Sequence, residues 1–270
     1  MTNNRQEPDT KYSLILGASS GFGAATAKRL AKEGHNVFGV HLDRRAAMPT
    51  VEELINVLQA SGAEVHFYNI NAADEEKRRE VVKDIREVIP QGNYVKVLMH
   101  SLAFGTLKTF LDETPEKSIS RSNMMMTMDV MAHSLVYWVQ ELYWADLLGH
   151  GSRIYAMTSH GSENVVPFYG AISAAKSALE NHIRQLALEL GGLGATAVAL
   201  KAGVTNTPAL QKIPGHQEMI DAATRRNPAG RLTTPEDVAN IIAVLSTMDG
   251  QWINGEVIAV DNGESVMDKT

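Results

Sequence analysis

Short apolar runs that alternate with longer stretches of helical periodicity constrain the fold of this chain more than any other feature. This alternation is typical of βαβ units, which form a parallel sheet with helices on both faces. We therefore expect an α/β fold, a Rossmann-type doubly wound parallel sheet of about seven strands. The predicted strands are Ser13–Leu16, Asn36–Val40, Glu64–Tyr68, Val95–Met99, Arg153–Met157, Ala195–Leu200 and Val257–Val260. The predicted helices are Gly23–Glu33, Thr50–Ser61, Asp74–Val88, Met124–Leu147, Ser173–Leu190 and Pro235–Ser246.

One segment interrupts this alternation between the sixth and the seventh predicted strand. Residues 205–228 are rich in proline and contain only a possible short helix, Gln217–Arg225. Ligands of open parallel sheets bind beyond the carboxyl ends of the strands, where this segment begins. We therefore expect a lid at about 205–228 within a single domain over residues 11–265, after a flexible N-terminus at residues 1–10.

Composition narrows the class of function. The 270 residues are 44% hydrophobic and carry a net charge of −6, with no cysteine. A general nucleic-acid binder would show a basic stripe, and disulfides and thiolate metal sites need cysteine, so these classes are excluded. No stretch approaches the roughly 18 apolar residues of a membrane-spanning helix, and the polar N-terminus shows no secretory signal. We expect a cytoplasmic protein without a metal, a nucleic-acid partner or a membrane partner.

A glycine-rich loop joins the first predicted strand to the first predicted helix. Its glycines at 17, 21 and 23 follow the pattern Gly-x3-Gly-x-Gly. Glycine allows a tight turn and a close approach of the backbone to a ligand, and the following helix offers unpaired N–H groups to a phosphate. The loop therefore predicts a dinucleotide site. The contacts expected from it are Gly17, Ser19, Ser20, Gly21, Phe22 and Gly23.

This glycine spacing resembles that of the short-chain dehydrogenase/reductase family, and the resemblance continues over residues 11–263. Pro228–Leu232 followed by Pro235–Ala239 is similar to the family's late helix signature, and Ile253–Gly263 to its last strand and closing turn. The resemblance implies a nicotinamide dinucleotide cofactor. It also implies cofactor contacts at Ile70, Asn71, His100, Ser101, Leu102, Lys176, Ala202, Gly203, Val204, Thr205 and Thr207.

The end of the second predicted strand bears on which cofactor is used. A dehydrogenase that prefers NAD usually carries a carboxylate there, which binds the ribose 2′-hydroxyl. This chain has His41 at the matching position, followed by Asp43, Arg44 and Arg45. Arginine suits the 2′-phosphate of NADP, whereas the alternative is that Asp43 binds the ribose and the arginines are solvated. We expect His41, Arg44 and Arg45 to contact NADPH, with NADH as the open alternative.

The most informative departure from the family concerns its catalytic tyrosine. Ordinary members carry Tyr-x3-Lys, but here Ile172 stands four residues before Lys176 and cannot donate a proton. The nearest tyrosine is Tyr169, which gives Tyr-x6-Lys, with Ser159 ten residues before it. Tyr-x6-Lys resembles the enoyl-acyl-carrier-protein reductases, a divergent branch of the family. Met131, which replaces the helix Asn of ordinary members, is in keeping with that branch.

Further segments resemble the same branch. They are His100–Gly105 after the fourth predicted strand, Ala202–Thr207 after the sixth, and the flanks of the lid, which are similar to the NADPH-using type of enoyl reductase. The resemblance implies reduction of the carbon–carbon double bond of a trans-2-enoyl thioester, carried on coenzyme A or on an acyl carrier protein.

The residues present suit that chemistry. Tyr169 would hydrogen-bond the thioester oxygen as negative charge builds on it, and Ser159 would assist in binding the carbonyl. Lys176 would hold the nicotinamide ribose and lower the pKa of the tyrosine. Seven helical steps rise about 10 Å, so Tyr169 is expected just before the helix that carries Lys176. The expected substrate contacts are Ala103, Phe104, Leu210 and Ile213.

Two other functions stay open on the sequence. One is a carbonyl or 3-oxoacyl thioester reductase that uses Ser159 and Tyr169 in an unusual geometry. The other is a non-catalytic nucleotide-binding sensor or scaffold. Basic residues around the lid form either a solvated face or a small basic patch for a phosphopantetheine or an acidic carrier protein. They are Lys201, Lys212, Arg225, Arg226 and Arg231.

The long helix predicted at Met124–Leu147 is rich in methionine and aromatic residues, which suit packing between subunits. The family resemblance implies that this helix pairs across a two-fold axis, so we expect a homotetramer. Tyr137 and Tyr155 are expected in the core. His160 and His182 have no histidine or carboxylate partner at metal-ligand spacing, so we expect them to be structural or exposed.

Overall fold

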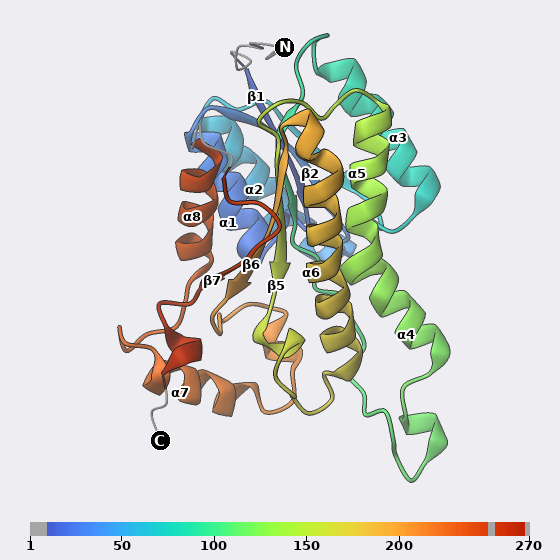
Figure 1. Ribbon diagram of the computed structural model, residues 1–270, viewed down its shortest axis with the longest axis vertical. Coiled ribbons are helices and arrows are strands. Elements are labelled where there is room, and N and C mark those ends of the chain that lie inside the picture. Colours follow the sequence, from blue (N-terminus) through green and yellow to red (C-terminus); the bar gives the residue numbers. More distant parts are fainter. Residues whose placement is uncertain (1–9, 248–251, 268–270) are drawn as a thin grey trace.

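The computed structural model describes residues 10–247 and 252–267, and it contains one sheet of seven strands between two layers of helices (Figure 1). Neighbouring strands all pair in parallel, in the order β3-β2-β1-β4-β5-β6-β7. This confirms the predicted Rossmann-type doubly wound sheet. The strands are β1 (Lys11–Leu16), β2 (His35–His41), β3 (Val65–Asn69), β4 (Val95–His100), β5 (Arg153–Thr158), β6 (Thr196–Ala202) and β7 (Val257–Val260).

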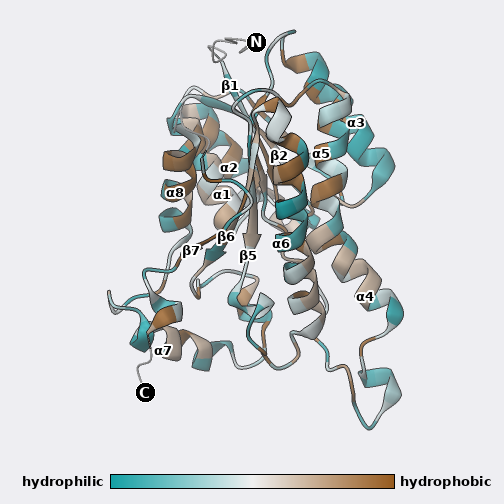
Figure 2. Cartoon of the chain, viewed as in Figure 1, coloured by the Kyte–Doolittle hydropathy of each residue, from teal (hydrophilic) through white to brown (hydrophobic). Residues whose placement is uncertain are grey.

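Helices cover both faces of the sheet because each strand directs alternate side chains to opposite faces. Leu14 and Leu16 pack with the layer of α3, α5 and α6, whereas Ile15 packs with the layer of α1, α2 and α8. The central strands are mostly brown and α3 is mostly teal in Figure 2, as expected for a buried sheet covered by amphipathic helices. The helices are α1 (Gly21–Lys32), α2 (Met48–Ala60), α3 (Glu75–Val88), α4 (Arg121–Met128), α5 (Ser134–Trp144), α6 (Gly170–Leu190), α7 (His216–Arg226) and α8 (Pro235–Thr247).

The helix predicted as one element at Met124–Leu147 is interrupted, so that prediction is wrong in detail. A π-helical turn at Asp129–His133 separates α4 from α5. Beside it, the Ser134 hydroxyl donates to the carbonyl oxygen of Val130 at 2.7 Å, a bond that competes with regular helix geometry. α4 also begins earlier than predicted because Ser120 caps its first turn.

The carboxyl ends of the strands lie at the lower edge of the sheet in Figure 1. At this edge lie the segment 205–228 with α7, which is the predicted lid, the segment 101–120, which follows β4, and the loop 159–169, which follows β5. Of the predicted flexible N-terminus, residues 1–9 lie outside the described residues. None of the helices that the structure describes is long and apolar enough to span a membrane.

Candidate active site

The glycine loop after β1 is packed too closely for side chains at two of its positions. A Cβ atom on Gly17 would lie 2.3 Å from the carbonyl oxygen of Ser101, and one on Gly23 would lie 2.0 Å from that of Gly17. Gly17 also has a φ of +89°, which disfavours other residues. The loop is fixed to β2, since the N–H groups of Gly17 and Ala18 donate to the carbonyl oxygen of Val40. Only glycine therefore fits at these two points.

The first turn of α1 is free to receive an anion. Ser20 is the N-cap residue, but its side chain forms no capping hydrogen bond, and the first turn contains no acidic residue. The exposed ends of these N–H groups and the helix dipole favour a pyrophosphate here. Thr207 approaches the same turn, with its Cγ2 atom 3.5 Å from the Cβ position of Gly21. The residues present therefore fit a dinucleotide, as predicted from the glycine spacing.

Residues at the ends of β2 and β3 lie where the adenosine of such a dinucleotide binds. His41 is buried, with its Nδ1 atom 2.9 Å from a carboxylate oxygen of Asp43, while Arg44 and Arg45 are exposed. Ile70 and Asn71 follow β3; the Ile70 N–H donates to the carbonyl oxygen of His41, and the exposed Asn71 side chain accepts from the N–H of Ala73.

His100, predicted as a cofactor contact, has its ring fully buried at the end of β4. Its Nε2 atom lies 2.9 Å from the Ser134 hydroxyl, whose own proton goes to Val130, so Nε2 donates to this oxygen. Burial lowers the pKa of His100 to about 3, helped by the positive charge of Lys176. The imidazole is therefore neutral and fixes the π-helical turn. His100 as a whole is 0% exposed, and its expected cofactor contact stays a prediction.

The next four residues, 101–104, lie between the glycine loop and the segment that follows β4. The Ser101 N–H donates to the carbonyl oxygen of Leu16, which joins β4 to the glycine loop. Leu102 is partly buried and packs against the core, whereas Ala103 and Phe104 are exposed. The other two expected substrate contacts lie in the segment 205–228, where Leu210 is buried and Ile213 is partly buried.

Lys176 is buried in α6 and faces the end of β5. Its ammonium group donates to the carbonyl oxygen of Met157 at 2.7 Å. Burial lowers the pKa of Lys176 to about 8, against the opposing effect of the carboxylate of Glu180 one helical turn away. Glu180 itself is buried and accepts a hydrogen bond from the Thr158 hydroxyl at 2.6 Å. Sequence reasoning missed Glu180, although a carboxylate four residues after the lysine is a visible signal.

Tyr169 is the N-cap residue of α6, as the seven-residue spacing predicted. Gly161 makes room for its ring, since a Cβ atom there would lie 2.5 Å from the ring atom Cε1. The preceding residue, Phe168, has a φ of +64°, a strained conformation for a bulky residue and one that often accompanies functional sites. The loop therefore holds the tyrosine in a position that costs backbone strain.

Burial raises the pKa of the Tyr169 hydroxyl, and the nearby Ser159 opposes that rise. Lys176 is not among the causes of this shift, so its expected lowering of the tyrosine pKa stays a prediction. The Ser159 oxygen is buried and forms no hydrogen bond of normal geometry in the part of the chain that the structure describes. A buried hydroxyl without a partner is costly unless a ligand supplies one.

Hydrocarbon fills the place where ordinary members of the family carry their catalytic tyrosine. Ile172 and Met131 are buried, at 6% and 2% exposure. Gly105 of the segment after β4 packs on both, since its Cβ position lies 2.6 Å from Ile172 Cγ1 and 2.8 Å from Met131 Sδ. The N–H of Thr106 donates to the Thr127 hydroxyl and fixes this segment over α4. Position 172 therefore carries no proton donor and is almost entirely covered by these side chains.

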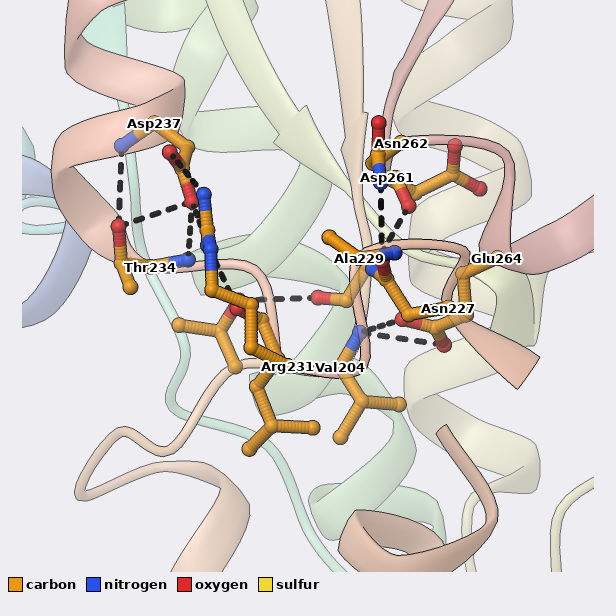
Figure 3. A network of polar contacts seen from close by, with 12 residues as sticks. Val204, Asn227, Ala229, Arg231, Thr234, Asp237, Asp261, Asn262 and Glu264 are labelled. Carbon is orange, nitrogen blue, oxygen red and sulfur yellow. Dashed lines mark hydrogen bonds and ion pairs between the residues drawn. The ribbon is translucent and has the colours of Figure 1, made fainter. Parts of the chain in front are cut away.

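The closing turn after β7 is hydrogen-bonded to the loop that follows β6 and to the end of the segment 205–228 (Figure 3). The N–H of Val204 donates to the carboxylate of Glu264 at 3.2 Å, and the Asn227 side chain donates to the carbonyl oxygen of Asp261 at 3.2 Å. Gly203 is packed against Glu264 and Thr233, which leaves no room for a Cβ atom. Burial raises the pKa of Glu264.

The sequence resemblance pointed to a closing turn within Ile253–Gly263, but it did not single out Glu264 or the contacts that the turn makes. The available signal was the Asp-Asn-Gly-Glu sequence directly after the last strand, a pattern typical of a tight turn. Two predicted cofactor contacts belong to the loop that it holds: Thr205 is buried and donates to the carbonyl oxygen of Gly203, and Ala202 is buried at the end of β6.

The basic residues near the lid do not form one solvated face. Lys201 is buried in β6 and pairs with Glu163 at 2.5 Å, and Arg231 pairs with Asp237 at 2.6 Å. Arg226 lies 4.0 Å from Glu264. Lys212 and Arg225 are exposed. A docking patch made of all five residues is therefore contradicted by the burial of Lys201, whose strand position turns it towards the loop after β5.

His160 and His182, which the sequence predicts to be structural or exposed, are both partly buried, and each faces a side chain from a distant element. His160 lies 3.4 Å from Asp261, and His182 lies 3.0 Å from His133. Among the described residues, no group of three or more such side chains could hold a metal ion. Tyr155 is buried as predicted, whereas Tyr137 is only partly buried and donates to Asp129.

The chain is similar to known oxidoreductases over nearly all of its length. Residues 17–265 match a family model described as enoyl-(acyl carrier protein) reductase. The NADH-dependent enoyl-[acyl-carrier-protein] reductase of Aquifex aeolicus is 27% identical over 259 residues, which cover 95% of this chain and 92% of the relative. Its crystal structure superposes with a TM-score of 0.81, at 26% identity, over 99% of this chain and 100% of that one.

Other relatives carry different activities and cofactors. The 3-oxoacyl-[acyl-carrier-protein] reductase of Thermotoga maritima is 25% identical, over 94% of this chain and 97% of its own length. A short-chain dehydrogenase of Burkholderia cenocepacia, solved with NADP, shares the fold with a TM-score of 0.78 at 24% identity, over 97% of this chain and 100% of that one. The chain belongs to the enoyl-(acyl carrier protein) reductase family of the short-chain dehydrogenases/reductases, and is an oxidoreductase that uses a nicotinamide cofactor.

Proposed function

We propose that this protein reduces the carbon–carbon double bond of trans-2-enoyl thioesters with NADPH. The observation that carries the proposal is the burial of Ile172 and Met131 beneath Gly105. A ketone reductase of the ordinary kind needs a proton donor at that place, and hydrocarbon cannot donate. The hydroxyls that remain at the site are those of Tyr169 and Ser159, which lie beside each other at the start of α6 and the end of β5.

These two hydroxyls suit an oxygen that gains negative charge during reaction. When bound, the nicotinamide would supply a hydride to the β-carbon of the enoyl thioester, and the resulting enolate would take a proton from water at its α-carbon. Tyr169, kept neutral by its raised pKa, donates a hydrogen bond to the thioester oxygen as the enolate forms. The Ser159 hydroxyl is buried beside Tyr169 without a hydrogen bond of normal geometry, and it donates to the same oxygen. Both donors are preorganised, so they need little rearrangement in the transition state.

Lys176 acts on the cofactor side of the reaction. Its ammonium is fixed on Met157 and would hold the hydroxyls of the nicotinamide ribose. Because its pKa is only about 8, a modest rise in pH removes the charge that this contact requires.

The surroundings of the site suit an apolar acyl chain. Phe104, Phe110 and Phe168 are exposed, at 56%, 55% and 41%, on segments that border Tyr169. The Phe110 ring lies against Gly170, the residue after the tyrosine. Leu210 and Ile213 of the proposed lid at 205–228 are the further expected contacts. An exposed apolar surface of this kind is typical of a binding site.

One observation favours the rival reaction, reduction of a 3-oxoacyl thioester. Ser159 stands thirteen residues before position 172, which is the ordinary family spacing for the catalytic serine. In the rival reaction Tyr169 would protonate an alkoxide at the carbon that accepts the hydride. The two reactions differ in which carbon is reduced, so the products separate them.

The test measures turnover of a 2-enoyl thioester with NADPH in the unaltered protein, in Tyr169→Phe and in Ser159→Ala. We expect kcat to fall by about 100- to 1,000-fold in Tyr169→Phe and by less in Ser159→Ala, because each variant removes one donor to the enolate oxygen. Tyr143→Phe is the matched control, since this tyrosine is 56% exposed on α5. Full activity of Tyr169→Phe would refute the assignment.

A further inference from the structure

The carboxylate of Asp43, whose side chain is 24% exposed, contacts a buried histidine at the end of β2. Its Oδ2 atom lies 2.9 Å from Nδ1 of His41. A carboxylate can only accept, so the imidazole donates this bond. The His41 side chain is only 2% exposed and its ring lies 5.8 Å from that of Phe67, so the core fixes the donor. The direction of the Asp43 side chain is therefore set by a buried residue.

The backbone of Asp43 is held from the neighbouring strand. Its N–H donates to Oδ1 of Asn69 at 3.0 Å, and Nδ2 of Asn69 donates to its carbonyl oxygen at 2.9 Å. Asn69 stands opposite His41 in the register of β2 and β3. Two residues that face each other across the strands thus fix both the backbone and the side chain of Asp43.

This position decides between the two nicotinamide cofactors. A carboxylate at the end of the second strand favours NADH when it hydrogen-bonds the ribose hydroxyls, and it repels the 2′-phosphate of NADPH. Here that carboxylate is already engaged by His41. Arg44 and Arg45 follow it, are exposed, and form no ion pair in the described part of the chain. Their guanidinium groups can therefore form bidentate hydrogen bonds with a phosphate.

We propose that His41 is a specificity-determining residue that selects NADPH over NADH by holding the Asp43 carboxylate away from the ribose. The inference rests on the proposed use of NADPH and deepens it, because it names the residues that set the preference. It does not depend on which thioester is reduced.

The experiment measures binding by calorimetry with NADPH, NADH and two fragments, adenosine 2′,5′-bisphosphate and AMP. The fragments report on the ribose pocket alone and need neither the nicotinamide nor turnover. The variants are His41→Leu, which removes the donor, and His41→Gln, whose amide can still donate to Asp43. Each is made with Asp43 intact and with Asp43→Asn, and thermal unfolding shows which variants remain folded.

The unaltered protein is expected to bind the bisphosphate about tenfold more tightly than AMP, and NADPH more tightly than NADH. In His41→Leu the released carboxylate should bind the ribose, so each preference should shrink by about tenfold, the worth of one charged hydrogen bond. His41→Gln should keep the preference. In the Asp43→Asn background, replacing His41 should leave the preference for the bisphosphate and for NADPH unchanged, because no carboxylate is left to release.

The inference would be overturned if the preference for NADPH stays the same in His41→Leu. It would also be overturned if His41→Leu reduces the preference equally with Asp43 intact and with Asp43→Asn. If His41→Leu does not fold, Asn69→Ala serves instead, because Asn69 is exposed and its loss frees the Asp43 backbone. We expect a smaller shift in the same direction, and no shift would again overturn the inference. Continued thioester reduction alongside such a result would leave the proposed reaction intact. A native preference for AMP and NADH would overturn the inference and the proposed NADPH use together.

Discussion

The two halves of the site are built by different parts of the chain. On the cofactor side, main-chain atoms shape the loop, since the Cβ positions of Gly17 and Gly23 fall on carbonyl oxygens. On the substrate side, side chains shape the site, since the Cβ position of Gly105 meets Ile172 and Met131. A backbone atom cannot move without its strand or helix, whereas a side chain can change its rotamer. The cofactor half should therefore tolerate less change.

The largest effect is expected for Gly17→Ala. Its methyl group would overlap the Ser101 carbonyl oxygen and would also require a left-handed backbone, so we expect NADPH affinity to fall at least about 100-fold. The matched control is Gly34→Ala, which has a similar φ of +82° but no atom within 4 Å of the added Cβ. It should lose about 1 kcal/mol of stability and keep its affinity. Calorimetry and urea unfolding measure both quantities, and equal loss of affinity in the two variants would contradict the comparison.

The next largest effect is a pH dependence of both stability and activity that arises from Lys176. Its folded pKa of about 8 lies below its ordinary value of 10.5, so between these values the unfolded chain binds more protons than the native one. Stability from this group should therefore rise with pH from about 8 to 10.5, by roughly 3 kcal/mol at most. Activity should fall over the same range, because the charged form holds the ribose.

Two measurements between pH 8 and pH 10.5 test whether stability rises while activity falls. They are the free energy of unfolding, from denaturant titration, and kcat/KM. Lys176→Met removes the titrating group and should abolish the rise in stability. If stability and activity of the unaltered protein both fall as the pH rises, Lys176 does not cause the pH dependence.

A smaller effect is expected for Gly105→Ala on the substrate side. The added methyl group meets side-chain atoms that can shift, so the loss of stability should be about 1–3 kcal/mol. Met131→Ala in the same chain should recover part of this loss by making space. Urea unfolding of the single and double variants measures the coupling. If the two losses simply add, side chains do not shape this half.

The smallest effect is expected for Glu264→Gln in the closing turn. Burial raises the pKa of Glu264, so its charged form opposes folding as pH rises above 4.5, while a glutamine oxygen can still accept from Val204. Stability at neutral pH should stay within about 1 kcal/mol of the unaltered protein, whereas Glu264→Ala should lose about 1–3 kcal/mol because the Val204 N–H loses its partner. Thermal unfolding separates these outcomes, and a large loss in Glu264→Gln would show that the charge itself is needed.

What could be predicted from the sequence follows the same division. The glycine loop is contiguous, so its spacing alone indicated a strand, a turn and a helix with a phosphate site. The position of Tyr169 before α6 followed from helical rise. The contacts of Gly105 could not be predicted, because residues 127, 131 and 172 come together only through the packing of α4 and the π-helical turn against α6. The partners of His160 and His182, and the burial of Lys201, likewise depend on tertiary structure.

The most direct measurement offers the protein an equal mixture of a 2-enoyl thioester and a 3-oxoacyl thioester of the same chain length, with NADPH. Mass spectrometry then identifies the products formed before either substrate is exhausted. If position 172 is closed by hydrocarbon and Tyr169 serves a conjugated carbonyl, the saturated acyl thioester should be the dominant product. A dominant 3-hydroxyacyl thioester would contradict the proposed reaction and would assign Ser159 and Tyr169 to ketone reduction.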